Sequence, residues 1–113
     1  MDSLPLRDGS PFGYFTDLHG FKDFVGMVIV CAPDQFPRAE WRDPDEQLNL
    51  DRAFEGLRYG LRLTAQEKGE SARLYRCREL VEEAFVEYRA GRDREGQDKL
   101  EEMEKLLRKF PSQ

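Results

Sequence analysis

The stretch FVGMVIVCA, residues 24–32, is the longest apolar run in the sequence, and the interpretation of every other segment depends on it. Leu18 and Phe21 lead into this run and Pro33 ends it. Apolar residues recur here at three- and four-residue steps, which is the spacing of one helix face. Thr16 or Asp17 supplies a suitable N-cap. We therefore predict a helix over residues 16–32.

A buried strand is the alternative for this run, because Val25, Val28 and Ile29 are β-branched. A strand needs ladder partners, and no other segment of the chain offers a convincing one. Side chains after Phe24 are apolar on nearly every side of the helix. Such a helix is expected to be buried, so we expect it to be the central and most buried one of the fold.

Three further segments, 45–66, 71–90 and 94–110, also have helical periodicity. The first follows a capping Asp43, with Pro44 at the first helical position. Ser71 caps the helix predicted over 71–90, which ends at Gly91. Short joins at 67–70 and 91–93 favour antiparallel neighbours. The expected fold is a single all-α domain, a compact antiparallel bundle of about four helices.

Two segments do not fit this helical pattern. Residues 1–15 contain two prolines and two glycines, yet they end in an aromatic cluster, so we expect an ordered arm across the core. Residues 33–44 contain Pro33, Pro37 and Pro44, which exclude a continuous helix. A loop of this length is uncommon unless it is functional or packed down.

Composition narrows the class of protein. The 113 residues suit one domain, and the net charge of −5 disfavours nucleic-acid binding, which needs a basic face. The apolar run is far shorter than the about 20 residues that span a bilayer, so no membrane association is expected. Cys31 and Cys77 lack a CxxC pattern and are predicted to be core residues of a reduced, cytoplasmic protein.

No catalytic or metal motif emerges. His19 is the only histidine, and zinc or di-iron sites need more ligands than the chain can supply at the right spacing. We expect His19 to be exposed at a helix start. Acidic pairs such as Glu82 and Glu83 lie on charge-dense helix faces, where solvation is expected rather than a raised pKa. The sequence predicts a protein that is not an enzyme and has no cofactor.

The loop 33–44 and the residues just after it are the best candidate for partner binding. Residues 34–55 contain seven acids against three arginines, so this segment carries −4 of the chain's −5. Tryptophan, tyrosine and arginine dominate interface hot spots. The alternative is that Phe36 and Trp41 only cap one open end of the bundle. The predicted partner-binding residues are Asp34, Phe36, Arg38, Glu40, Trp41, Asp43, Asp45 and Glu46.

In short length, acidic balance, helical character and the acidic segment around Trp41, the chain resembles the small cytoplasmic immunity proteins that bacteria pair with antibacterial toxins. This resemblance implies a non-enzymatic inhibitor that covers the active site of a cognate toxin. Its carboxylates would meet cationic groups in a basic cleft of the toxin. Trp41 and Phe36 would be the anchors.

Two other classes stay open. One is a helical adaptor or regulatory subunit, forming a homodimer through the helix at Leu100–Phe110. The other is a small-ligand or catalytic bundle with a pocket near His19 and Tyr14.

Overall fold

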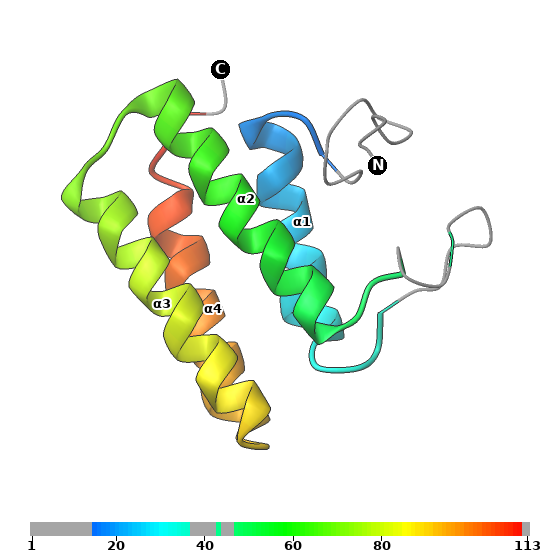
Figure 1. Cartoon of the computed structure of the whole chain (residues 1–113). Coiled ribbons are helices and arrows are strands. Elements are labelled where there is room, and N and C mark those ends of the chain that lie inside the picture. The colour runs from blue at the N-terminus through cyan, green and yellow to red at the C-terminus, as the bar shows by residue number, and fades with distance from the viewer. Residues whose placement is uncertain (1–14, 37–42, 44–46, 112–113) are drawn as a thin grey trace.

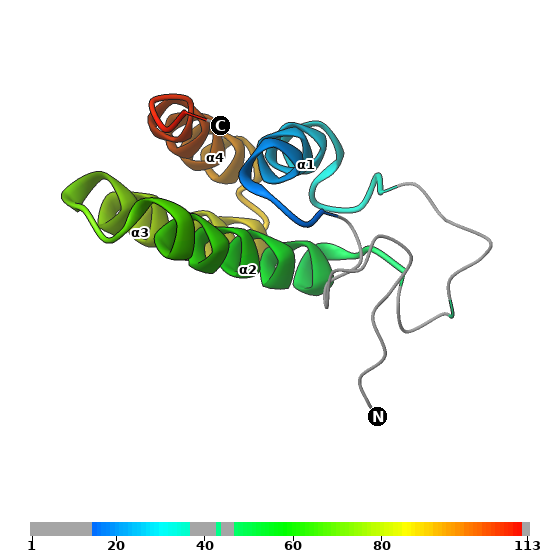
Figure 2. The same ribbon diagram turned by 90° about the horizontal axis from the view of Figure 1, so that it is seen from above.

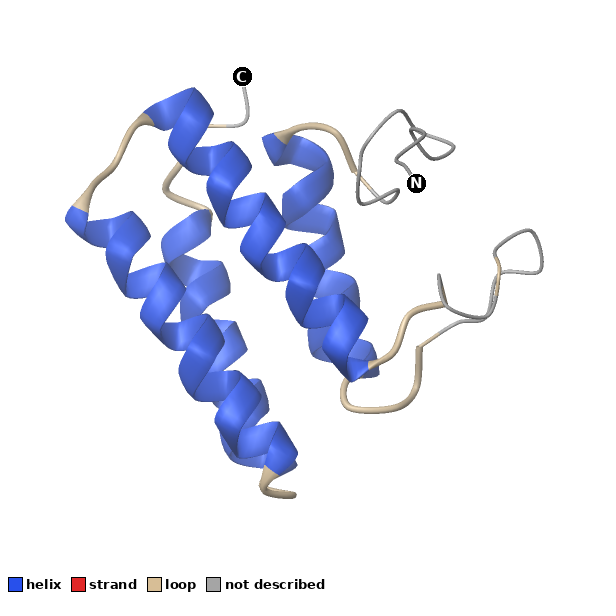
Figure 3. Ribbon diagram, in the orientation of Figure 1, coloured by secondary structure: helices blue, strands red, loops and turns tan. Residues whose placement is uncertain are grey.

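The computed structural model describes residues 15–36, 43 and 47–111, and in this part of the chain every regular element is an α-helix (Figure 3). The helices are α1 (Leu18–Cys31), α2 (Leu50–Lys68), α3 (Ala72–Arg89) and α4 (Asp93–Leu107). The prediction of an all-α bundle is confirmed, and residues 24–31 belong to a helix rather than a strand. The expected N-terminal arm lies outside the described residues, except for the buried Phe15.

The four helices alternate in direction and form two layers. Helices α2 and α3 make one layer, and α1 and α4 make the other (Figures 1 and 2). Each helix packs on the next one in the sequence, and α1 also packs on α4, so the helices form a closed ring. The most extensive interface lies between α3 and α4. Helix α1 ends and α2 begins at the end of the bundle opposite the C-terminal end of α4 (Figure 1).

The core is a single cluster of apolar side chains contributed by all four helices. Four tilted aromatic pairs and one edge-on pair, with ring centroids 5.0–6.0 Å apart, join Phe15 to α1 and α2 and join α2 to α3. The largest fully buried side chains are Phe21, Phe54, Leu18, Leu57, Leu61, Leu74, Leu80, Leu100, Met103 and Leu107, with Val25 and Val28.

Two glycines allow helices to approach closely. A Cβ at Gly60 of α2 would lie 2.0 Å from the Phe21 ring of α1, and a Cβ at Gly96 of α4 would lie 2.7 Å from the Tyr88 ring of α3. Both distances are far below van der Waals contact. The aromatic rings therefore occupy the space that a side chain at either position would need.

Side-chain caps begin three of the helices. The side chains of Asp17, Asn49 and Ser71 accept from backbone N–H groups of the first turns of α1, α2 and α3 at 2.8–3.1 Å. The predicted start of the second helix at residue 45 is therefore wrong. Residues 47–49 are not helical, and the helix begins at Leu50 because Asn49 provides the cap.

The ends of the last three helices are set by glycine for α2 and α3 and by core packing for α4. Gly69 and Gly91 both have φ of +81°, a left-handed conformation that glycine adopts without strain, and they follow α2 and α3. Helix α4 ends at Leu107 rather than at residue 110. Phe110 still packs into the core beyond the helix end, where its backbone carbonyl accepts a hydrogen bond from Lys22.

The expectation that the first helix is central is also wrong, because the four helices form a ring and none lies in its middle. Helix α1 packs mainly on α2 and α4, and its outer side faces away from the bundle. Val30, inside the apolar run, is 79% exposed, and Ile29 is only half-buried. The apolar residues of α1 thus exceed what its two neighbours cover.

Among the described helices, none combines the length and hydropathy needed to cross a bilayer.

Candidate protein-binding surface

The predicted partner-binding segment leaves the bundle where α1 ends. The N–H groups of Ala32 and Gln35 donate to the carbonyls of Val28 and Cys31 at 2.8 and 2.7 Å, which fixes the first turn after the helix. Phe36 is half-buried and packs against the core. The chain is therefore anchored on this side only a few residues beyond α1.

The segment returns to the bundle at a second anchor. Gln47 and Leu48 are each 8% exposed, and Asn49 caps α2 immediately afterwards. The chain between Phe36 and Gln47 therefore starts and ends against the folded core. We call these contacts, of Phe36 on one side and of Gln47 and Leu48 on the other, the fixed base of the segment.

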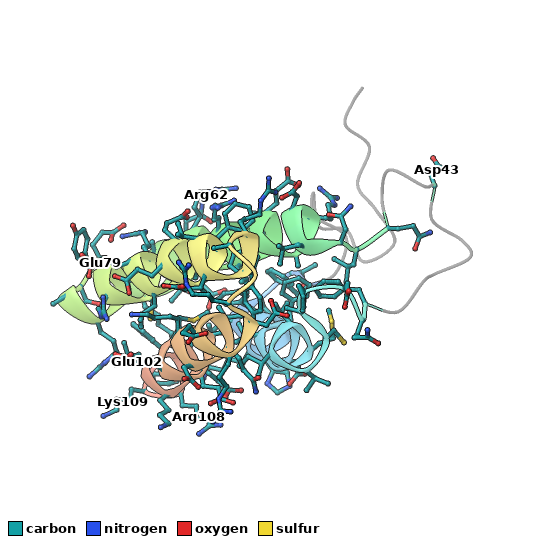
Figure 4. All side chains as sticks on the ribbon, turned by 90° about the horizontal axis from the view of Figure 1, so that it is seen from below. Asp43, Arg62, Glu79, Glu102, Arg108 and Lys109 are labelled. Carbon is teal, nitrogen blue, oxygen red and sulfur yellow. The ribbon has the colours of Figure 1, made fainter. Side chains whose placement is uncertain are left out.

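The predicted site residues fall into two groups. Asp34, Phe36 and Asp43 are described, and both aspartates are exposed. Asp43 lies away from the four helices (Figure 4). The packing of Phe36 on the core agrees with the capping alternative for this residue. The remaining predicted residues, Arg38, Glu40, Trp41, Asp45 and Glu46, lie outside the described part of the chain.

The acidic character of this end is weaker than the sequence count indicates. Asp51 at the start of α2 pairs at 2.8 Å with Arg89 of α3, an arginine outside residues 34–55. The Arg89 pair joins residues far apart in the sequence, so a count over neighbouring residues misses it. Asp34 accepts a hydrogen bond from the neighbouring Gln35 side chain, at 3.1 Å, and this neutral amide does not cancel its charge.

A second surface lies on the outer side of the α2/α3 layer. A pocket of about 220 Å³ there is lined by Arg58, Leu61, Arg62, Arg78, Val81 and Glu82. Arg58 forms two hydrogen bonds with Glu82, at 2.7 and 2.9 Å, and this contact lowers the pKa of the Glu82 carboxyl. Arg78 forms a similar pair with Glu70. Because two of its three arginines are neutralised, the pocket has little positive charge left for an anion.

The only histidine is placed as predicted. His19 is exposed in the first turn of α1. Across residues 15–36, 43 and 47–111, no group of three or more His, Cys, Asp and Glu side chains has an arrangement that could hold a metal ion.

Comparisons of the chain with protein-family models, with curated proteins and with solved structures find no match. The surfaces of this fold therefore have to be interpreted from their own chemistry.

Proposed function

We propose that the protein is a non-enzymatic, protein-binding inhibitor of the immunity-protein type. Its partner would dock at the end of the bundle where α1 ends and α2 begins, and would present a basic cleft. The observation that supports this proposal is the exposed Asp34 next to Phe36, on a connection that is anchored to the core at both ends.

Charge and anchoring have separate roles in this proposal. Exposed carboxylates attract a basic cleft over a distance and mainly raise the association rate. The fixed base of the segment reduces the entropy lost on binding. Affinity would then come from an aromatic anchor, for which Trp41 is the candidate.

The first experiment is capture from the native cell lysate with the full chain as bait, followed by mass spectrometry. The proposal expects one stoichiometric partner that is toxic when expressed alone and harmless when expressed together with this protein. No such partner, or several weak ones, would contradict the proposal and favour the adaptor class.

Charge reversal then tests the location of the surface. The double variant Asp34→Lys/Asp43→Lys should bind the partner more slowly, and its association should lose most of its dependence on salt. The matched control is Asp23→Lys/Glu67→Lys, because both of these acids are exposed elsewhere on the bundle and the net charge changes equally. Equal effects of the two double variants would contradict a specific surface at the α1–α2 end.

The single tryptophan gives a separate readout. Trp41→Ala should weaken binding by about 2 kcal/mol or more while the helical circular dichroism is kept. Loss of the helical signal would instead identify Trp41 as part of the core, and the anchor assignment would then be wrong.

A further inference from the structure

The outer face of the α1/α4 layer combines an apolar helix side with a row of charges. A groove of about 480 Å³ runs along it, lined by Gly26, Ile29 and Val30 from α1 and by Glu101, Glu104, Lys105 and Arg108 from α4. Arg108 points outward from this layer, on the side of the bundle opposite Arg62 of α2 (Figure 4). This α1/α4 face lies on the side of the bundle, and its Val30 end adjoins the end that carries Asp34.

The apolar part of the face is not explained by the fold. Val30 is 79% exposed, whereas a helix in a four-helix bundle usually presents polar residues outward. Gly26, one turn earlier, leaves open space, since a Cβ there would meet only the Glu104 carboxylate, at 3.9 Å. The α1 side therefore carries a protruding apolar side chain and, one turn away, a gap.

The charges on α4 are ordered along the helix. Acids Glu101 and Glu104 come first, and bases Lys105 and Arg108 follow. Glu104 and Arg108 pair with each other at 3.1 Å. Among the described residues, Lys105 has no ion-pair partner, and Glu101 accepts only a hydrogen bond from Gln97, at 3.1 Å. Two opposite charges one turn apart are thus left without ion pairs.

The order of charges along α4 is complementary to the same order on a second, antiparallel copy of the helix. A two-fold interface brings residue i of one copy to residue j of the other, and residue j to residue i. If two α4 helices lie antiparallel, with the symmetry axis midway between Glu101 and Lys105, each Glu101 faces the Lys105 of the other copy.

The same axis also matches the apolar residues of α1. Helices α1 and α4 run antiparallel, and Gly26 is level with Glu104 (Figure 1). Val30, four residues later, is then level with a position near Glu101. The midpoint between Gly26 and Val30 thus lies within about one residue of the axis that relates the α4 charges. Each Val30 would fill the gap over Gly26 of the other copy.

We infer that the α1/α4 face is a docking surface for a second copy of this chain, in a two-fold dimer whose paired helices are antiparallel. At about 1.5 Å per residue and about 10 Å per helix width, this face projects about 400 Å² per copy. That is about half of what a standard interface buries per partner. The dimer is therefore weak and reversible.

Sedimentation velocity of the full chain, from micromolar to millimolar concentration, tests the inference. The wild type should shift from monomer to dimer across this series. Val30→Lys should raise the dimer Kd at least about tenfold. The matched control is Val86→Lys, because Val86 of α3 is 59% exposed but lies on the other layer, and this variant should dimerise like the wild type. A wild type that stays monomeric throughout would overturn the inference.

Charge exchange tests the symmetry itself. Glu101→Lys and Lys105→Glu each place like charges across the axis, so each variant alone should weaken dimerisation about tenfold or more. An equimolar mixture of the two variants should form heterodimers, because the lysine introduced in one variant then faces the glutamate introduced in the other. Ion pairs within one chain cannot produce this return of dimerisation in the mixture. A mixture that stays as monomeric as its components would overturn the proposed arrangement, even if the wild type dimerises.

Discussion

The close crossing of α1 and α2 predicts that alanine has opposite effects at two helical glycines. Replacing a glycine inside a helix by alanine ordinarily stabilises the helix by about 1 kcal/mol. At Gly60 this gain is opposed, because the new Cβ would lie 2.0 and 2.1 Å from two atoms of the Phe21 ring. Phe21 is completely buried, and the close packing of protein cores leaves such a ring little room to move.

Overpacking of this kind costs about 1–3 kcal/mol, and a contact this short belongs at the upper end of the range. Gly60→Ala should therefore destabilise the protein by about 2 kcal/mol net. At Gly26 the nearest atom lies at 3.9 Å, so helix propensity dominates, and Gly26→Ala should stabilise the protein by about 0.5–1 kcal/mol.

Urea unfolding followed by circular dichroism measures both variants, and dilute protein keeps any dimer out of the comparison. The m-values should stay unchanged, while the midpoints move in opposite directions. In thermal unfolding, Gly60→Ala should lower Tm by about 8 °C, because 1 kcal/mol shifts a domain of this size by about 4 °C. If Gly60→Ala stabilises the protein as Gly26→Ala does, the close α1–α2 crossing is wrong.

Three further predictions concern single side chains. The buried Tyr88 hydroxyl has no hydrogen-bond partner within the described part of the chain, so Tyr88→Phe should be neutral or stabilising by about 1 kcal/mol in urea unfolding. Burial, with the charge of Asp93 nearby, raises the pKa of Tyr88 from 10.0 to about 12. As the pH rises from 10 to 12, the unfolded chain therefore loses this proton more readily than the folded protein, and the wild type should lose stability. Tyr88→Phe should lose less stability over the same interval. Burial also raises the pKa of the Cys77 thiol to about 11, so a thiol reagent at mildly alkaline pH should modify native Cys77 only after unfolding; rapid labelling would contradict its burial. The Arg58 contact lowers the pKa of Glu82 from 4.5, so the stability that this ion pair contributes is present above that pH and is lost as the pH falls below it. Arg58→Met should reduce this loss of stability in acid. It should cost under about 1 kcal/mol at neutral pH, since both side chains of the pair are largely exposed.

Periodicity and capping chemistry predicted most of the fold. The spacing of apolar residues located all four helices, and Ser71 and Gly91 marked the two ends of α3 where the structure has them. Local rules worked here because a cap depends on residues within one turn of it. The start of α2 was misplaced because Asp43 and Asn49 are both acceptable caps. The structure distinguishes them, because the Asn49 side chain accepts a hydrogen bond from the Arg52 N–H, at 2.8 Å.

The position of α1 could not be predicted in the same way. A run of apolar residues shows that a helix must be covered, but it does not show whether the same chain or another molecule covers it. Val30 lies in the most apolar stretch of the sequence and is nevertheless largely exposed. Pairing between distant residues, such as Asp51 with Arg89, likewise requires the fold before it can be counted.

The candidate binding residues were predicted from composition, and the structure describes Asp34, Phe36 and Asp43 among them. The self-complementary charges of α4 could have been found in the sequence, as acids followed by bases on one helix face. Without the position of α1 beside them, such an order is only what the helix dipole favours. The gap over Gly26 and the exposed Val30 lie beside these charges, and this is why we connect the order of charges with a dimer.

The ring of alternating helices also has a kinetic consequence. Two of its four interfaces, α2/α3 and α3/α4, join helices through three-residue connections, so these contacts close short loops and form quickly. The interface between α1 and α4 joins segments far apart in the chain, and it closes the longest loop of the fold. We expect α3 and α4, which share the largest interface and a three-residue connection, to form an early hairpin. Closure of α1 against α4 would then come late, so mutations at this seam should mainly accelerate unfolding and leave the folding rate nearly unchanged.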